Sequence, residues 1–181
     1  MPQTDTAELV VLLDDDGRTI GSAPKAQVHH ASTPLHLAFS CYLFDDAGRV
    51  LLTRRAVHKR TFPGIWTNTC CGHPAPGEAL QDAVTRRVRE ELGVGITDLR
   101  CVLPDFRYRA VAADGVVENE VCPVFCGRAV GQVHPDRDEV ADHVWVPWQH
   151  MRAAAEFGWA ISPWAAEQVP LLDAAGIGHR D

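Results

Sequence analysis

Apolar residues recur at every fourth position in one highly charged stretch of the chain. They are Leu80, Val84, Val88 and Leu92. This spacing places the four side chains along one face of a helix. Gly93 follows at a position suited to a left-handed C-terminal cap, and Gly77 and Glu78 suit the start of the helix. The pattern therefore predicts an amphipathic helix between these glycines.

Most other apolar runs are short and bounded by turn residues, which is typical of strands. The predicted strands cover residues 8–13, 19–21, 35–44, 49–54, 100–103, 106–110, 116–126 and 143–146, with tight turns at 14–18, 45–48 and 114–115. Residues 25–34 are polar and predict a loop or short helix. Further helices are predicted at 148–156 and 163–174, the latter irregular around Pro170. Because strands and helices do not alternate strictly, we predict the α/β class, with an α/β/α sandwich around a mixed β-sheet.

Length and composition indicate a single folded domain. The chain has 181 residues, of which 46% are hydrophobic, so it can bury a sizeable core and disorder is excluded. No linker or repeat divides residues 1–181, and residues 176–181 are predicted to form a loose tail. The net charge of −7 argues against nucleic-acid partners. No apolar run approaches a membrane span and the N-terminus is polar, so we expect a cytoplasmic protein without a membrane partner.

The strand at 116–126 carries two carboxylates on one face. Side chains alternate between the faces of a strand, so Glu118 and Glu120 point the same way. Buried carboxylates need a partner or a metal ion. The alternative is an edge strand with its polar face in water, which Pro123 would fit.

The stretch from Asn68 to Glu78 combines Cys70, Cys71 and His73 with turn-forming glycines. No structural core requires this mixture. The remaining cysteines lie in strand-like runs, where a small buried apolar side chain is the default and a zinc site at Cys122 and Cys126 is disfavoured. They are Cys41, Cys101, Cys122 and Cys126.

A basic cluster and a histidine-rich segment supply further candidate ligands. The cluster contains Arg54, Arg55, Lys59 and Arg60. It is either a solvated run of charge or a cradle for phosphate groups, since arginine offers a bidentate fork. His29, His30 and His36 lie close together in the chain, which is suggestive of a metal site and no more.

The spacing around the predicted helix resembles the Nudix box. The matching residues are Gly72, Glu78, Arg86, Val88, Glu90, Glu91, Gly93 and Val94. The resemblance implies that carboxylates hold a divalent cation which binds a diphosphate, and hard oxygen ligands suit Mg²⁺. Nudix hydrolases carry Glu where this chain has Arg87. The lost carboxylate weakens the case for hydrolysis. Without the box, Arg86–Glu90 and Arg87–Glu91 would be read as ion pairs on a solvated helix face.

Segments outside the box resemble one Nudix branch, the type I isopentenyl-diphosphate isomerases. The similar segments begin at Leu35 (LHLAFS), Leu52 (LTRRA), Pro63 (PGIWTN), Cys71 (CGHP), Pro104 (PDFRYR), Val117 (VENEVCPVF) and Ser162 (SPW). Together they span about Glu8 to Trp164, nearly the whole chain. The resemblance implies an isomerase of isoprenoid biosynthesis that interconverts isopentenyl and dimethylallyl diphosphate. Separately, we expect a monomer.

The resemblance also implies the ligands of two cations. One divalent metal would be held by His29, His36, His73, Glu118 and Glu120. This donor set suits Mn²⁺, Mg²⁺ or Zn²⁺. His30 competes with His29, and the family's spacing to His36 favours His29. Glu91 would hold a second cation, Mg²⁺ on the substrate diphosphate. The positions that would grip the diphosphate are Lys25, Arg55, Lys59 and Arg87.

Cys71 and Glu120 match the family's two acid–base positions on opposite faces of the substrate. Tyr108 would assist Glu120, and Trp164 would face the carbocation formed between the two proton transfers. The N-terminal segment would order over the site when metal and substrate bind. The alternatives are a Nudix hydrolase of a nucleoside diphosphate derivative and a non-catalytic module that binds metal or diphosphate.

Overall fold

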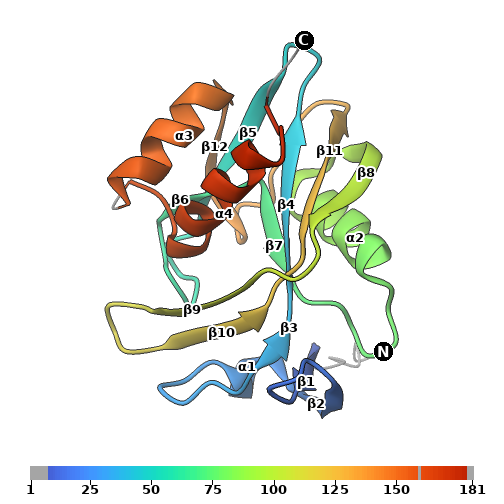
Figure 1. Cartoon of the computed structure of the whole chain (residues 1–181), viewed down its shortest axis with the longest axis vertical. Helices are drawn as coiled ribbons and strands as arrows, with labels where there is room; N and C mark the ends of the chain where they lie inside the picture. The colour runs from blue at the N-terminus through green and yellow to red at the C-terminus, as the bar shows by residue number, and fades with distance from the viewer. Residues whose placement is uncertain (1–7, 159, 179–181) are drawn as a thin grey trace.

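The computed structural model describes residues 8–158 and 160–178 and contains strands, helices and short connecting loops (Figure 1). The strands are β1 (Leu9–Leu13), β2 (Thr19–Pro24), β3 (His36–Leu37), β4 (Phe39–Phe44), β5 (Arg49–Arg55), β6 (Trp66–Thr67), β7 (Cys70–Gly72), β8 (Gly95–Leu103), β9 (Arg107–Val111), β10 (Val117–Val121), β11 (Val124–Val130) and β12 (Val140–Pro147). The helices are α1 (Lys25–Val28), α2 (Leu80–Leu92), α3 (Trp148–Phe157) and α4 (Pro163–Ala174).

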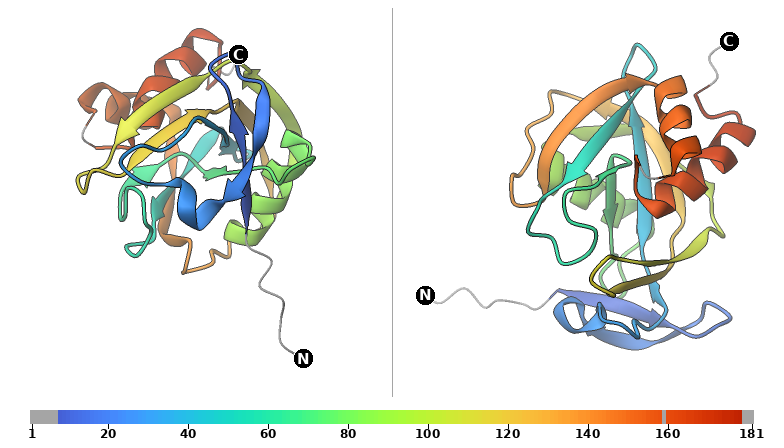
Figure 2. Two further views of the ribbon diagram at one scale, coloured as in Figure 1. Left: turned by 90° about the horizontal axis from the view of Figure 1, so that it is seen from below. Right: turned by 90° about the vertical axis from the view of Figure 1, so that its left-hand side faces the viewer.

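The strands form two mixed sheets, where the sequence predicted one. The small sheet has the order β2-β1-β3-β10-β9, with β3 and β10 parallel. The large sheet has the order β12-β5-β4-β11-β8, with β4 and β11 parallel, and β6 and β7 pair with β5 and β4. The small sheet lies at one end of the large one (Figure 2).

Helices cover both faces of the large sheet, as the predicted α/β/α sandwich requires (Figure 1). On one face Val84 and Val88 of α2 pack in a core cluster with Cys41 of β4. On the other face Trp164 of α4 packs in a second cluster with Tyr42. Cys41 and Tyr42 are consecutive, so the alternation of β4 divides its side chains between the two cores. Both are fully buried.

Two predicted long strands each divide into two. The predicted strand at 35–44 becomes β3 and β4, which are separated at Ala38. The predicted strand at 116–126 becomes β10 and β11, which are separated by Cys122 and Pro123. At each break the chain passes from the small sheet to the large one. The edge-strand alternative is wrong, because β10 lies between β3 and β9 and β11 lies between β4 and β8.

The amphipathic helix forms as predicted. Gly93 caps α2 in the left-handed conformation with φ 69°, and its N–H donates to the Arg89 carbonyl. Gly72, just before the helix, has another requirement, because a Cβ there would lie 2.9 Å from Phe39 Cζ and 3.1 Å from Arg87 Cγ. The close approach of β7 to β4 and α2 therefore needs glycine.

Three local predictions are wrong or fall partly outside the described residues. The predicted loose tail begins at Gly176, but Ile177 is 5% exposed and packs in the core cluster with α3 and α4. Residues 179–181 lie outside the described residues. Cys101, predicted to be buried, is exposed because β8 is an edge strand of the large sheet. Helix α4 runs continuously through Pro170. No helix in the described part of the chain is long and apolar enough to cross a membrane.

Candidate active site

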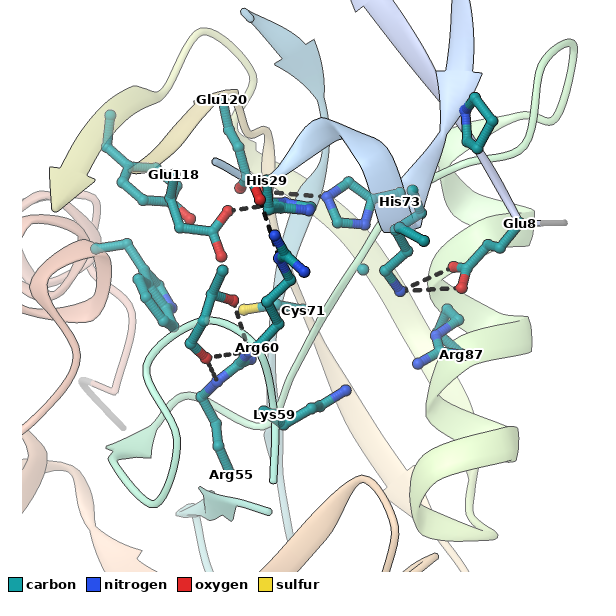
Figure 3. Close-up of a pocket in the computed structure, with 17 residues that line it drawn as sticks. Glu8, His29, Arg55, Lys59, Arg60, Cys71, His73, Arg87, Glu118 and Glu120 are labelled. Carbon is teal, nitrogen blue, oxygen red and sulfur yellow. Dashed lines mark hydrogen bonds and ion pairs between the residues drawn. The ribbon is translucent and has the colours of Figure 1, made fainter. Parts of the chain in front are cut away.

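A cavity of about 560 Å³ lies where the small sheet meets the large one (Figure 3). Side chains from both sheets, from the loops after α1 and β5, and from α2 and α4 converge on it. The predicted site residues that line it are Lys25, His29, Arg55, Lys59, Cys71, His73, Arg87, Tyr108, Glu118, Glu120 and Trp164. Two predicted site residues, His36 and Glu91, do not line it and are described separately below.

Three imidazoles surround one carboxylate beside this cavity. Ligand atoms of His29, His36, His73 and Glu120 all lie within 4.8 Å of one another. Glu120 Oε1 is 3.3 Å from His36 Nε2 and 3.2 Å from His73 Nε2. Glu118 joins the group through its Oε2 atom, 3.2 Å from His29 Nε2. The predicted ligands, drawn from four separate segments of the chain, therefore form one cluster.

The electrostatics of the cluster fit a divalent cation. His36 Nδ1 lies 2.9 Å from the Pro34 carbonyl, which orients the ring so that Nε2 faces Glu120. Among the described residues, His36 Nε2 and Glu118 Oε2 have no hydrogen-bond partner, and both atoms are buried. Burial raises the pKa of Glu120, but the neighbouring imidazoles of His36 and His73 outweigh it and hold that pKa well below its usual value. A buried carboxylate kept ionised among imidazoles is the donor set of a metal site.

Strand pairing explains why these residues meet. His36 of β3 and Glu120 of β10 are direct partners across the parallel pair, and Tyr108 of β9 is the partner of Glu120 on its other side. His30 does not join them, because it is exposed and its Nδ1 accepts a hydrogen bond from the Ser32 N–H. The geometry therefore selects His29 over His30.

Cys71 of β7 lines the same cavity. Its thiol lies 3.3 Å from Asn68 Oδ1 and 3.5 Å from Ser40 Oγ. Burial raises the pKa of Cys71 to about 11. The side chain is therefore a protonated thiol at neutral pH, which makes it a possible proton donor to a bound substrate.

Aromatic rings form the wall next to Cys71. Trp164 packs edge-on against Phe62 with centroids 5.3 Å apart and lies 5.7 Å from the ring of Tyr108. Burial raises the pKa of Tyr108 well above its usual value, so its hydroxyl stays protonated. The Arg55 guanidinium lies 5.7 Å from the centroid of the Trp164 ring. Phe62 packs against Trp164 but is not among the residues that line the cavity.

Five cations face the cavity, and sequence analysis assigned four of them to the site. The fifth is Arg60, whose Nε donates to the His29 carbonyl at 3.0 Å. The sequence signal that could have identified Arg60 was its place in the basic cluster. Lys25 pairs with Glu8 at 3.0 Å, and Lys59 pairs with Glu139. Arg54, in the same basic cluster, points away and donates to the Gly64 carbonyl at 2.9 Å.

Glu91 lies behind Arg87 and away from the main cavity. Arg87 Nη2 is 2.5 Å from Glu91 Oε1 and 3.4 Å from Glu139 Oε1. Burial raises the pKa of Glu91, against the lowering effect of Arg87. Glu91 and Glu139 line a narrower cavity that shares Arg55, Lys59 and Cys71 with the main one. Glu91, the predicted ligand of the second cation, therefore lies beside the main cavity and forms an ion pair with Arg87.

Comparison with known proteins identifies close relatives. Residues 34–167 match the model of the NUDIX domain family. The isopentenyl-diphosphate Delta-isomerase of Frankia alni is 60% identical over 172 residues, covering 94% of this chain and 89% of that protein. The protein of the same name from Clavibacter michiganensis is 58% identical over 180 residues, covering 99% and 92%. That from Klebsiella pneumoniae is 51% identical, covering 92% and 91%.

Solved structures with little sequence identity share the fold. The structure of DR0079 from Deinococcus radiodurans matches with a TM-score of 0.71 at 18% identity, covering 91% of this chain and 98% of that one. A MutT protein from Methanosarcina mazei matches with a TM-score of 0.63 at 20% identity, covering 79% and 96%. At these identities the likeness is evidence for the fold alone.

Proposed function

Because this chain belongs to the Nudix family and, within it, to the isopentenyl-diphosphate Delta-isomerases, we propose that it interconverts isopentenyl and dimethylallyl diphosphate. It is thus an enzyme that supplies the allylic primer of isoprenoid biosynthesis. The observation that carries the proposal is a single cavity lined by Cys71, Glu120 and Trp164 together with several cations. An acid, a base, an aromatic face and a diphosphate cradle are what this reaction needs.

The diphosphate binds to the basic side of the cavity. The proposal assigns this role to Lys25, Arg55, Lys59 and Arg87. Arg60 is added because it lines the same cavity. Arginine forks suit the planar arrangement of phosphate oxygens, and lysine supplies a mobile point charge. Lys25 and Lys59 are paired with Glu8 and Glu139 in this structure. The substrate therefore exchanges these carboxylates for its own oxygens.

Two proton transfers move the double bond. One proton is added to the terminal methylene carbon of isopentenyl diphosphate, which leaves a tertiary carbocation. A second proton is then removed from the carbon next to the one that bears the diphosphate, so the molecule gains and loses one proton. Cys71 and Glu120 exchange these protons, assisted by the neighbouring hydroxyl of Tyr108. Solvent resets their protonation after each turnover.

The cavity wall protects the carbocation. The face of Trp164 attracts positive charge, and such cation–π attraction strengthens when water is excluded. Trp164 is 2% exposed, so water reaches little of its ring. Exclusion of water from this wall also prevents water from adding to the carbocation. Diphosphate bound beside Arg55 places the hydrocarbon end of the substrate near this ring, because Arg55 contacts both regions.

His29, His36, His73, Glu118 and Glu120 would hold one divalent cation, for which Mn²⁺, Mg²⁺ and Zn²⁺ are the candidates. When bound, the cation fixes the Glu120 carboxylate and biases its proton exchange. Glu91 would hold Mg²⁺ on the diphosphate, in place of its ion pair with Arg87. The metal identity, the monomeric state and the cytoplasmic location stay predictions.

Hydrolysis of a nucleoside diphosphate derivative is not retained as an alternative. Arg87 occupies the position of a hydrolase carboxylate and neutralises Glu91, leaving fewer free carboxylates for a catalytic metal cluster. The close relatives named above are isomerases.

Proton NMR of isopentenyl diphosphate with the purified protein in deuterated water tests the function. We expect dimethylallyl diphosphate to appear with Mg²⁺ and Mn²⁺ present, and deuterium to enter its new methyl group. Unchanged isoprenyl signals with Mg²⁺, Mn²⁺ and Zn²⁺ would rule out the isomerase. Release of inorganic phosphate in the same sample would instead support hydrolysis.

A further inference from the structure

Asn68, in the turn between β6 and β7, connects Cys71 with Trp164. It is fully buried. Its Oδ1 accepts hydrogen bonds from Trp164 Nε1 at 3.0 Å and from the Cys71 thiol at 3.3 Å. One acceptor atom therefore touches both a proposed proton carrier and the proposed carbocation-facing ring.

The orientation of this amide is fixed by its other end. Asn68 Nδ2 donates to the Cys41 carbonyl at 3.1 Å and to the Cys70 carbonyl at 2.9 Å. A flipped amide would place its oxygen against two carbonyl oxygens, so only one orientation satisfies both ends. Oδ1 also accepts from Thr67 Oγ1 at 2.7 Å, a contact that involves neither Cys71 nor Trp164.

Ser40 is the second polar neighbour of the Cys71 sulfur. Its Oγ lies 3.5 Å from Cys71 Sγ and 3.4 Å from Cys122 Sγ. Gln168 Nε2 donates to Ser40 Oγ at 3.0 Å, so the serine proton is free to point at a sulfur. Tyr42 in turn donates to Gln168 Oε1 at 2.8 Å. The sulfur therefore has two polar neighbours, Asn68 and Ser40.

Helix α4 anchors both polar groups. Trp164 and Gln168 lie one helical turn apart, and both are buried on the face that packs against the large sheet. Trp164 contacts Asn68, and Gln168 contacts Ser40. Because the helix is rigid, Trp164 and Gln168 keep a fixed position relative to each other. The positions of Asn68 and Ser40 are therefore coupled to the position of the Trp164 ring.

We propose that Asn68 and Ser40 are positioning residues for the isomerisation, which fix the Cys71 sulfur relative to the Trp164 ring. Rotation about the Cβ–Sγ bond can then turn the thiol hydrogen toward the substrate while the sulfur stays in place. A buried amide is costly unless every polar atom is paired, and a hydrophobic side chain would fill the turn at lower cost. The proposal rests on the proposed function of Cys71. It concerns groups that do not line the cavity and leaves the diphosphate cradle untouched.

The variants Asn68→Ala and Ser40→Ala test the proposal through kinetics in water and in deuterated water. We expect kcat to fall about 10- to 100-fold for Asn68→Ala, because small misplacements of reacting groups have effects of this size. A smaller fall is expected for Ser40→Ala. KM should change less than threefold, and the solvent isotope effect on kcat should increase, since the misaligned proton transfer becomes rate-limiting.

The isotope effect separates positioning from a structural role. A variant that merely lowers the folded fraction loses kcat but keeps the wild-type isotope effect. Two matched controls remove neighbouring bonds and should keep wild-type kinetics: Thr67→Val loses one donor to Asn68 Oδ1, and Tyr42→Phe loses the donor to Gln168. If Asn68→Ala does not fold, Ser40→Ala decides on the same readout.

Unchanged isotope effects in every folded variant would overturn the proposal, as would controls that behave like the test variants. The wild-type enzyme is the reference for each assay. Absence of wild-type turnover would refute the proposed function, whereas normal wild-type turnover with unaltered isotope effects in the variants would refute only the positioning roles.

Discussion

Cys70 and Cys71 are adjacent in the chain but lie on opposite faces of the large sheet. Cys70 packs in the core with α2, whereas Cys71 packs against the core with α4 and lines the cavity. Two identical side chains therefore have different surroundings. Its place before Gly72 and His73 set Cys71 apart in the sequence, and its acid–base role rested on the resemblance.

The first prediction compares these two thiols. Cys71→Ala should lower kcat by at least about 100-fold, because it removes an acid–base group. Cys70→Ala should keep activity within a few fold and lose about 1 kcal/mol of unfolding free energy, because it leaves only a small cavity. Turnover by NMR and urea unfolding check both. Near-normal turnover of Cys71→Ala would remove it from the mechanism.

The second prediction compares His29 with His30. His29→Gln should lower the affinity for Mn²⁺ or Zn²⁺ at least about tenfold, since it removes one imidazole from the buried cluster. His30→Gln should leave the affinity unchanged, because His30 is exposed and outside the cluster. Equilibrium dialysis followed by elemental analysis measures both. Equal metal binding by the two variants would contradict the assigned ligand set.

Pairing across the sheet limits what residue patterns can reveal about this site. Alternation correctly placed Glu118 and Glu120 on one face of a strand, and both line the cavity. It could not place His36 beside Glu120, because that contact depends on a parallel pairing between distant segments. The resemblance supplied His36, and the register explains it. Sequence analysis missed Arg60 as a site residue. Which side chains of the basic cluster face the cavity depends on the path of the loop after β5, and the residue pattern does not show that path.

At the scale of elements, helix α2 was the most predictable part of the fold. Its apolar period and Gly93 cap are local signals, and both are present in the structure. The breaks at Ala38 and Pro123 were not predictable in the same way. The strand sequence continues through each break, and only the change of partner sheet divides it. The local residue pattern therefore predicted the strands and turns, but not the division of the strands between two sheets.

The loop before α2 is held to the helix by one bidentate ion pair. Arg86 Nε and Nη2 donate to Glu78 Oε1 and Oε2, each at 2.8 Å. The Ala75 N–H also donates to Glu78 Oε2 at 2.8 Å. Bonds from Arg86 and, to a lesser degree, Ala75 lower the pKa of Glu78 below its ordinary value of 4.5.

The third prediction concerns the pH dependence of this pair. The Glu78 pKa is depressed in the folded state, so its stabilisation is fully present above pH 4.5 and is lost as pH falls through the lower folded value. Glu78→Gln should therefore cost about 0.5–1 kcal/mol of unfolding free energy at pH 7, with a smaller difference at pH 3.5. Urea unfolding at both pH values measures this. An equal difference for Glu78→Gln at the two pH values would contradict the linkage.

At the scale of the molecule, charge is separated between surface and cavity. The chain carries a net charge of −7, yet Lys25, Arg55, Lys59, Arg60 and Arg87 all line one cavity. A concave site of one sign focuses the field and attracts an oppositely charged ligand. The net charge argued against nucleic-acid partners but could not reveal this cavity, because the cavity forms only when both sheets and α2 come together.

The fourth prediction compares neighbouring arginines on β5, which point in different directions. Arg55 faces the cavity and lies over Trp164, whereas Arg54 is exposed and bonded to the Gly64 carbonyl. Arg55→Gln should raise KM for isopentenyl diphosphate about 10- to 100-fold, because a charge-assisted hydrogen bond contributes about 1.5–3 kcal/mol. Arg54→Gln should leave KM within twofold.

Ionic strength distinguishes the local bond from the field of the whole cavity. Salt screens long-range attraction, and Arg54 does not line the cavity, so KM of Arg54→Gln should rise with salt as steeply as that of the wild type. Arg55→Gln should show a shallower rise, because one of the attracting charges is gone. Parallel salt dependences for wild type and Arg55→Gln would mean that Arg55 only shapes the wall beside Trp164. The diphosphate would then be held by the remaining cations.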